Sequence, residues 1–363
     1  MSLYPTKSLL FVGSYATNGE AGIHAVGVDE ESGECVLLHS VAGDVNPSYV
    51  LVHPNGRYLY ATNEIDLSAD IPGGAVSAYA IDTDSGRLTR LGRRSTQSSG
   101  PCHLSIDHSA RYLFASNYKG GGLTVLPILA DGSLGQATDY VQHMGKGTHP
   151  KRQDKAHAHS ALPAPRRDYV FVADLGLDQV VIYPFDVGTG KLDRRATVLK
   201  VADGAGPRHF TFSADARFMY LINELDSTVH VWRYDAERVT CELIQTISAL
   251  PEQFAEESWS AEIRLHPNGR FLYGSNRGHD SIVTYRVDPQ AGTLTLLGHT
   301  PCLGVWPRHF TLDNAGRLLI VANQHTNSIV SFHVNPETGA LTPTGHTLTI
   351  GKPTCVRFLE EGA

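Results

Sequence analysis

The sequence has few of the features that mark membrane, disulfide-rich or nucleic-acid-binding proteins. No stretch approaches the roughly 18 uninterrupted apolar residues that a membrane helix needs. The five cysteines are scattered and form no CxxC pair, which favours thiols over a disulfide framework or a zinc knuckle. The formal net charge of −7 argues against a general surface for nucleic acid or for an anionic membrane.

Targeting and helix signals are also sparse. The N-terminal segment MSLYPTKSLLFVGSY carries a single lysine and a short apolar run, which fits a strand better than a signal peptide. We therefore expect a cytoplasmic protein. No apolar pattern of helical period runs for the length of a helix, whereas alternating apolar residues punctuated by Gly, Asn and Asp indicate β-strands throughout.

What the sequence does contain is a repeat. A motif with Pro near its start, an alternating apolar segment, Gly or Ala before Arg, an apolar run and a closing Asn recurs about every 50 residues. Each copy predicts two short strands around a turn. A degenerate copy, HAHSALPAPRRDYVFVAD, closes on Asp174, and the clear copies close on Asn63, Asn117, Asn223, Asn276 and Asn323.

A second element, an alternating strand that usually closes on Asp or Asn, follows each copy. It occurs seven times, as GIHAVGVD, AVSAYAID, GLTVLPIL, QVVIYPFD, TVHVWRYD, SIVTYRVD and SIVSFHVN. Most of these are followed by a turn that contains Gly, such as ESGE or DSGR, and by a fourth, less regular strand. Four antiparallel strands repeated about every 50 residues are typical of a β-propeller blade.

The two ends of the chain predict how the ring closes. The chain starts with a second strand (LLFVGSY, 9–15) that has no first strand, and it ends on a first strand (KPTCVRF, 352–358) that has no second. Together they would complete a seventh blade and remove open sheet edges. We therefore predict an all-β, seven-bladed β-propeller with four antiparallel strands per blade. It would form one domain over residues 1–363, with the N- and C-terminal strands closing the last blade.

The blades should bring their variable polar residues together at one mouth of the central channel. In an antiparallel pair, the start of the first strand lies beside the end of the second, so every blade delivers these positions to the same side. Two long connections, 141–160 (basic) and 250–259 (acidic), reach this side and could act as rims or lids. The candidates at the first-strand entrances and second-strand exits are His103, His157, His159, Arg208, His209, Arg308, Glu64, Glu224 and Arg277.

Several candidates also have a purely structural interpretation. His159 could satisfy backbone groups at a blade entrance, and Arg208 and Arg308, at equivalent positions, could form structural salt bridges. The pair His157 and His159 suits zinc chemistry, but without carboxylates nearby in the sequence it is a weak signal. We therefore expect neither a metal nor a cofactor.

Arg277 and Glu224 favour a functional interpretation. Arg277 has no basic counterpart at its position in the other blades, and Glu224 lies beside the basic cluster. Arginine forks suit carboxylate or phosphate, and a Glu and a His among them can serve as base and acid. No GxSxG or catalytic-cysteine signature is present. The residues thus predict metal-free acid–base chemistry on a small anionic substrate, such as opening or closing an activated ester.

Five segments carry a family resemblance: NPSYVLVHPNGRYLYATNE, HAHS, ADLGLDQV, GPRHFTFSADARFMYLINE and SNRGHDSI. With them, essentially the whole chain resembles the seven-bladed-propeller lactonases, which include propeller-type 6-phosphogluconolactonases and fungal 3-carboxy-cis,cis-muconate lactonizing enzyme. The resemblance implies a catalytic set of one His, two Arg and one Glu, which by motif are His159, Arg208, Arg277 and Glu224. The candidate substrate-binding residues are then His103, His209, Arg308, His157 and Glu64.

The resemblance implies hydrolysis of a sugar-acid δ-lactone, first of all 6-phosphoglucono-1,5-lactone to 6-phosphogluconate, a step of the pentose phosphate pathway. A dicarboxylate sugar lactone (glucaro- or galactaro-1,5-lactone), carboxymuconate cycloisomerisation and a non-catalytic binding propeller are the alternatives. The residues leave open whether the substrate anion is phosphate or carboxylate, and whether His159 or Glu224 is the base. We expect a small anionic lactone as partner, no nucleic acid or membrane, and a monomer or homodimer.

Overall fold

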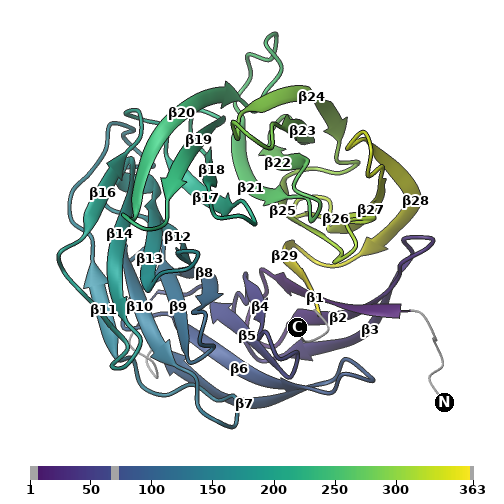
Figure 1. The fold of residues 1–363 in the computed structure, drawn as a ribbon. Helices are drawn as coiled ribbons and strands as arrows, with labels where there is room; N and C mark the ends of the chain where they lie inside the picture. Colours follow the sequence, from purple (N-terminus) through teal and green to yellow (C-terminus); the bar gives the residue numbers. More distant parts are fainter. Residues whose placement is uncertain (1–6, 67–72, 360–363) are drawn as a thin grey trace.

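The computed structural model describes residues 7–66 and 73–359, which form seven β-sheets arranged in a ring (Figure 1). Six sheets have four antiparallel strands, and in the seventh two short strands share the outer position. The predicted seven-bladed β-propeller is therefore confirmed. The predicted single domain includes residues 1–6, 67–72 and 360–363, which lie outside the described residues.

Each blade places its first strand nearest the axis of the ring and its fourth strand at the rim (Figure 1). The inner strands are β29 (Pro353–Phe358), β4 (Val50–Val52), β8 (Pro101–Ile106), β12 (Ala158–Pro163), β17 (Pro207–Phe212), β21 (Trp259–Leu265) and β25 (Pro307–Leu312). The second strands are β1 (Lys7–Ser14), β5 (Tyr58–Asn63), β9 (Tyr112–Asn117), β13 (Tyr169–Asp174), β18 (Phe218–Asn223), β22 (Phe271–Arg277) and β26 (Leu318–Asn323).

The outer half of each blade contains the third and fourth strands. The third strands are β2 (Ala21–Asp29), β6 (Ala75–Ile81), β10 (Gly122–Pro127), β14 (Gln179–Asp186), β19 (Thr228–Asp235), β23 (Ser281–Val287) and β27 (Ser328–Val334). The outer strands are β3 (Cys35–Ala42), β7 (Leu88–Ser95), β11 (Asp139–Gln142), β15 (Lys191–Leu192) with β16 (Thr197–Lys200), β20 (Thr240–Ser248), β24 (Leu294–Pro301) and β28 (Leu341–Thr349). One 3-10 turn, η1 (Leu175–Leu177), follows β13.

The closing blade joins the two ends of the described chain, as predicted. Strand β29 pairs antiparallel with β1, so that Leu10 lies opposite Phe358 and Gly13 lies opposite Cys355. The strand order β29-β1-β2-β3 completes this blade. Because the C-terminal strand supplies the inner position, the inner edge of β1 is not left unpaired.

Burial of the strands explains why their sequence patterns differ. Every residue of β9, β18 and β26 is buried, because a second strand is packed between neighbouring blades on both faces. Such strands carry near-continuous apolar runs. The rim strands β20 and β28 instead alternate between exposed and half-buried residues over much of their length, which explains why the fourth strand of each repeat is the least regular.

The turn between the third and fourth strands packs against an aromatic ring of the preceding blade. The turn glycines Gly292 and Gly339 have φ values of +75° and +74°. A β-carbon at these positions would lie 2.2 Å from Phe218 and 2.5 Å from Phe271, respectively. Only glycine accommodates both the positive φ and the approaching ring, which explains why the repeat keeps Gly in these turns.

Candidate active site

A β-bulge at the entrance of the inner strands sets the direction of several site residues. In β17 the pairing register with β18 shifts at the entrance and leaves Arg208 as the extra residue. The same shift leaves His159 extra in β12, Cys102 in β8 and Arg308 in β25. A bulge re-aims a side chain that regular pleating would point elsewhere. These four blades therefore each present an extra side chain near the strand entrance, and β29 and β21 have a register shift at the corresponding place.

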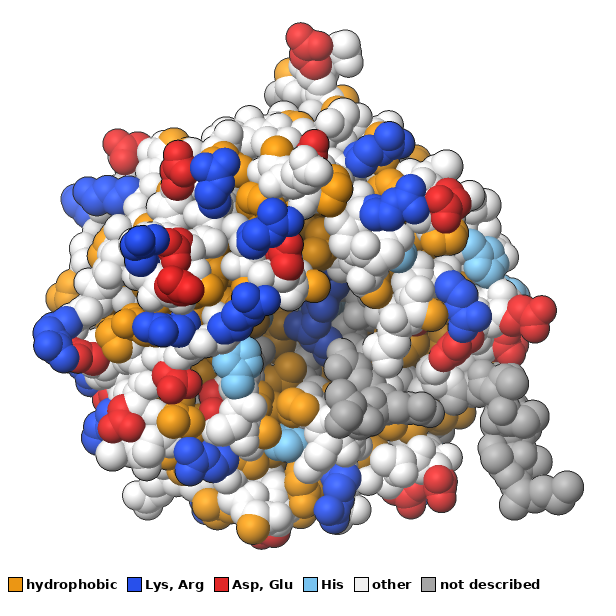
Figure 2. Space-filling model, viewed as in Figure 1, with side chains coloured by type: hydrophobic (Ala, Val, Ile, Leu, Met, Phe, Trp, Pro, Cys, Tyr) orange, Lys and Arg blue, Asp and Glu red, His pale blue; other side chains and the backbone are white. Residues whose placement is uncertain are grey.

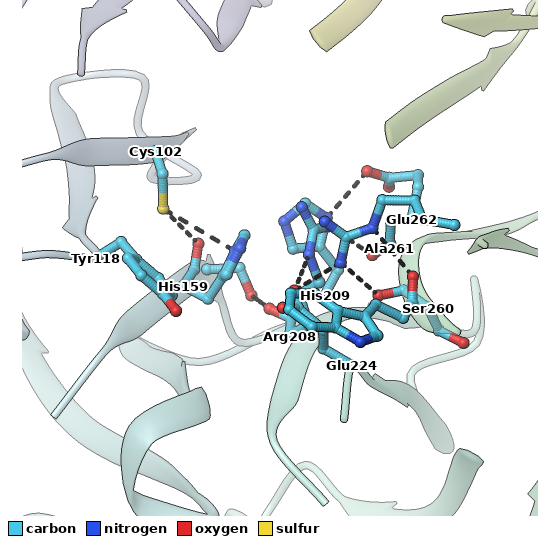
Figure 3. A network of polar contacts seen from close by, with 12 residues as sticks. Cys102, Tyr118, His159, Arg208, His209, Glu224, Ser260, Ala261 and Glu262 are labelled. Atoms are coloured by element: carbon cyan, nitrogen blue, oxygen red, sulfur yellow. Dashed lines mark hydrogen bonds and ion pairs between the residues drawn. The ribbon is translucent and has the colours of Figure 1, made fainter. Parts of the chain in front are cut away.

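Glu224, directly after β18, is paired with three guanidinium groups. Its side chain is 1% exposed, Arg208 Nε donates to its Oε2 at 2.9 Å, and Arg277 Nη2 lies 2.8 Å from the same oxygen. Arg152 Nη2 donates to the other carboxylate oxygen, Oε1. Figure 3 shows Arg208 and Glu224 pointing toward one another. One carboxylate therefore faces three cations.

Two of these arginines also donate hydrogen bonds to backbone carbonyls, in addition to their contacts with Glu224. Arg208 Nη1 donates to the carbonyl of Ala261 at 2.6 Å, and Arg277 Nε donates to the carbonyl of Trp259 at 3.0 Å. Nη2 of Arg208 and Nη1 of Arg277 have no hydrogen-bond partner among the described residues. Guanidinium nitrogens of this kind are well suited to binding an anionic oxygen.

The clustered charges determine the protonation states at neutral pH. Burial by itself would raise the pKa of Glu224, but Arg277, Arg152 and Arg208 together hold that pKa well below its usual range. Burial lowers the pKa of Arg277 to about 9, a shift that the attraction of Glu224 opposes. The carboxylate is therefore ionised and the guanidinium is positively charged at pH 7.

Arg152 is a site residue that the sequence did not reveal. It lies in the connection between β11 and β12, for which the basic composition predicted a rim or lid of the mouth without singling out any residue. Its Nη2 donates to Tyr118 Oη at 3.1 Å, and its guanidinium lies 4.2 Å from the ring centroid of Trp259. No sequence signal singles it out, because this connection holds several basic residues and strand periodicity does not define its path.

His159, the extra residue of β12, is buried next to the arginine cluster. Its Nδ1 lies 3.9 Å from Cys102 Sγ, and its ring packs edge-on at 5.4 Å from Tyr118 and 5.1 Å from His209. Burial, and then the positive charge of Arg208, lower its pKa well below the usual value. The imidazole is therefore neutral at pH 7 and can accept or relay a proton.

A second polar layer lies one residue further along the inner strands. His209 Nδ1 lies 2.9 Å from Glu262 Oε2, and His309 Nε2 lies 3.1 Å from the same oxygen. Burial lowers the pKa of His103 and His209 well below the usual value and that of His309 to about 4. Because a neutral His209 must donate through Nδ1 to the carboxylate, its Nε2 is an acceptor.

A cavity of about 230 Å³ opens against this second layer. Its wall includes His103, His209, Glu262, Arg264 and Arg357. Figure 2 shows the face of the ring with a central hollow in which basic side chains are visible. His103 and His209 therefore line an inner cavity whose wall does not include Glu224 or the arginines paired with it, and substrate binding by these histidines remains a prediction.

The contacts of His157 are those of a residue that stabilises the fold. Its Nδ1 lies 2.8 Å from the carbonyl oxygen of Tyr118, and its Nε2 lies 3.1 Å from Asp154 Oδ1. Its ring also stacks on the ring of Tyr118 at 4.4 Å. Both ring nitrogens are thus engaged within the protein, which favours the structural interpretation of this residue.

Arg308 and Glu64 lie together on another side of the mouth. The Arg308 guanidinium is 5.4 Å from the ring centroid of Tyr15, and Tyr15 Oη donates to Glu64 at 3.1 Å. Arg208 forms the buried ion pair considered from the sequence, whereas Arg308 forms none with the carboxylates of the described residues. The two equivalent positions therefore have different environments.

We expect the stability of the protein to fall as the pH decreases below neutrality. Burial lowers the pKa values of His103, His159 and His209 in the folded state, whereas each histidine of the unfolded chain titrates near 6.5. Below that pH the unfolded chain binds more protons, so the free energy of unfolding decreases. Three such groups predict a loss of roughly 2 to 3 kcal/mol between pH 8 and pH 6. Urea unfolding at both pH values measures the difference, and equal midpoints would contradict it.

Three kinds of feature are absent from the described part of the chain, residues 7–66 and 73–359. It contains no group of three or more His, Cys, Asp or Glu side chains placed to hold a metal ion. It also has no helix with the length and apolar character needed to cross a membrane. None of the five cysteines forms a disulfide there.

Comparisons with known proteins agree with this architecture. Residues 9–358 match the family model described as "Lactonase, 7-bladed beta-propeller". The chain is 34% identical over 356 residues to the 6-phosphogluconolactonase of Bacillus subtilis (strain 168), covering 98% of this chain and 99% of that protein. It is also 34% identical over 310 residues to the 6-phosphogluconolactonase of Formosa agariphila, covering 84% of this chain and 86% of that protein.

A solved structure of similar sequence has the same fold. It is the periplasmic gluconolactonase of Pseudomonas aeruginosa, with a TM-score of 0.91 and 33% sequence identity. The superposition covers 98% of this chain and 99% of that structure.

Proposed function

This chain belongs to the family of seven-bladed β-propeller lactonases, and we propose that it hydrolyses 6-phosphoglucono-1,5-lactone to 6-phosphogluconate. The observation that carries the proposal is the ionised carboxylate of Glu224, held among three guanidinium groups at the entrance of the inner strands. The relatives named 6-phosphogluconolactonase support the choice of substrate.

The charge balance of the mouth favours a dianionic substrate. Two of its carboxylates, Glu64 and Glu224, face four arginines, and burial keeps His159 neutral. The cluster formed by these side chains therefore has an excess of positive charge. A phosphate monoester carries about −1.5 to −2 charges at pH 7, which matches this excess better than a single carboxylate does. The four arginines are Arg152, Arg208, Arg277 and Arg308.

The residues assign a role to each step of lactone opening. Glu224 takes a proton from water while the water oxygen forms a bond to the lactone carbonyl carbon. The unused nitrogens of Arg208 and Arg277 stabilise the negative charge that develops on the carbonyl oxygen. The bond from that carbon to the ring oxygen then breaks, and the ring oxygen receives the proton, relayed from Glu224 by the neutral imidazole of His159.

Lactone hydrolysis by the purified protein tests the proposal. We expect enzyme-dependent hydrolysis of freshly made 6-phosphoglucono-1,5-lactone above the spontaneous rate, with the same rate in the presence of EDTA. A strong preference for glucaro-1,5-lactone would indicate that the same residues bind a carboxylate of the substrate instead of a phosphate. A loss of activity with EDTA would contradict metal-free chemistry. Hydrolysis of neither lactone would overturn the proposal and return cycloisomerisation and non-catalytic binding as explanations.

We also propose a cytoplasmic location and a role in the pentose phosphate pathway. The absence of disulfides among the five cysteines within the described residues supports a reducing compartment. The similar gluconolactonase of Pseudomonas aeruginosa is periplasmic, so the same fold also occurs outside the cytoplasm. Cell fractionation with detection of this chain distinguishes the two locations. A monomer or homodimer remains our proposal for the assembly.

A further inference from the structure

Arg152 differs from the other two arginines that contact Glu224 in its place in the fold and in its burial. Arg208 and Arg277 lie on strands β17 and β22, and their side chains are 2% and 3% exposed. Arg152 lies on the connection between β11 and β12, and its side chain is 19% exposed. Of the three guanidinium groups that hold Glu224, it is therefore the one most accessible to an incoming molecule.

The hydrogen bonds of Arg152 leave it free to exchange partners. Its Nε and Nη2 donate to Tyr118 Oη at 3.3 and 3.1 Å, and Nη2 also donates to Glu224 Oε1. Its Nη1 has no hydrogen-bond partner among the described residues, and no backbone carbonyl depends on this side chain. Arg152 can therefore move away from Glu224 without leaving a buried backbone carbonyl without a hydrogen-bond donor.

The backbone next to Arg152 is fixed, so the exchange needs only a change of side-chain rotamer. The neighbouring Gln153 is 1% exposed, and its Nε2 donates to the carbonyl of Leu175 at 2.8 Å and to Asp178 Oδ1 at 2.7 Å. Its Oε1 accepts from the backbone N–H of His149 at 2.8 Å. Because the backbone is fixed, the ordering cost of binding a ligand is confined to the Arg152 side chain itself.

Tyr118 and Trp259 form a platform on which Arg152 can bind a phosphate. The guanidinium lies 4.2 Å from the Trp259 ring centroid, which holds it by cation–π attraction. Tyr118 Oη accepts from the same guanidinium. An incoming phosphate oxygen can therefore bind the unpaired Nη1 of Arg152, and a change of rotamer along the same aromatic rings then moves Nη2 from Glu224 to the phosphate.

We propose that Arg152 is the residue that binds the phosphate of the substrate, and that in doing so it releases Oε1 of Glu224 to act on water. This inference rests on the proposed function, because it assigns the phosphate subsite of the same site. While the site is empty, Arg152 occupies Oε1 of Glu224. That oxygen can take a proton from water only when a phosphorylated lactone is bound. Selectivity for the phosphorylated lactone then appears in the chemical step as well as in binding.

Kinetics of an Arg152→Ala variant on two lactones test the proposal. The kcat/KM for 6-phosphoglucono-1,5-lactone should fall roughly 10- to 100-fold, as expected for the loss of a charge-assisted pair of hydrogen bonds. The kcat/KM for unphosphorylated glucono-1,5-lactone should stay the same or rise, because the variant no longer caps Glu224, so that the ratio of the two values falls sharply. Arg152→Lys, which keeps the charge but lacks the fork, should give an intermediate ratio.

Lys151→Ala is the matched control, because Lys151 is an exposed cation of the same connection. Its selectivity ratio should equal that of the unmodified protein. An Arg152→Ala variant whose activity falls equally on both lactones, or on neither, would overturn the assignment of Arg152 as the phosphate ligand.

A binding measurement separates this inference from the proposed function. Inorganic phosphate should bind the wild-type protein and Lys151→Ala with equal affinity in isothermal titration calorimetry, a readout that does not depend on the contact between Arg152 and the Trp259 ring. The same titration of Arg152→Ala should show binding weakened at least roughly tenfold. If no lactone is hydrolysed but phosphate binding depends on Arg152, the proposed function fails and the anion subsite stands. Equal phosphate affinity in all three proteins would overturn the subsite itself.

Discussion

Replacing Glu224 by Gln should reduce kcat for lactone hydrolysis by at least about 1,000-fold, because the variant lacks the group that takes the proton from water. Gln has nearly the same shape, so the substitution tests the charge rather than the packing. It also removes the one carboxylate that faces Arg152, Arg208 and Arg277. Initial rates on 6-phosphoglucono-1,5-lactone, corrected for spontaneous opening, measure the effect.

The same variant should also be less stable, by about 3 kcal/mol or more, since removing one partner of a buried ion pair leaves an uncompensated charge. Urea unfolding at pH 7 measures this loss. Glu242→Gln is the matched control, because its ion pair with Arg233 is exposed and contributes at most about 1 kcal/mol. A Glu224→Gln variant with full activity would exclude Glu224 from the mechanism.

The fold could be predicted from the sequence because the repeat reports strand pairing directly. Closing residues such as Asn117 and Asn223 mark the ends of the second strands β9 and β18. Closure of the ring followed from counting strands at the two ends, and the pairing of β29 with β1 confirms it. These features depend on local alternation and on the number of repeats, both of which a single sequence contains.

The site could be predicted only as far as the strands determine it. Arg208, Arg277 and Glu224 lie at strand ends. Both arginines contact the carboxylate of Glu224, so the three residues meet at one mouth of the ring, as expected. The resemblance singled out these residues together with His159. The bulges that leave Arg208 and His159 as extra residues could not be derived, because a bulge changes which way a side chain points without a distinct composition.

Arg152 could not be predicted because its position depends on tertiary contacts of a long connection. Gln153 anchors that connection to η1 and to Asp178, which no periodicity specifies. The division of the histidines into different environments has the same origin. His157 is engaged by Tyr118 and Asp154, whereas His159, only two residues later, lies next to the arginine cluster. Only the packed structure distinguishes two such neighbours.

Replacing Arg208 by Met should weaken both the stability of the site and its chemistry. Met fills much of the same apolar volume but leaves the carbonyl of Ala261 without its donor and Glu224 with one cation fewer. We expect a loss of about 1 to 3 kcal/mol in the free energy of unfolding, because the Ala261 carbonyl is left unsatisfied while Arg152 and Arg277 still pair with Glu224. We also expect a roughly 100- to 1,000-fold lower kcat, since a donor to the developing oxyanion is removed. Arg233→Met, at an exposed pair, is the control for both measurements.

Combining Arg208→Met with Glu224→Gln separates the two roles of this ion pair. Each single variant leaves a buried charge less compensated, whereas the double variant removes both charges together. Residues in direct contact couple by about 0.5 to 3 kcal/mol, so the double variant should be more stable than the sum of the single losses predicts. Its activity should nevertheless be as low as that of Glu224→Gln, because the base is still absent. Additive stability losses would show that Arg208 and Glu224 act independently, and restored activity would show that their charges matter only for folding.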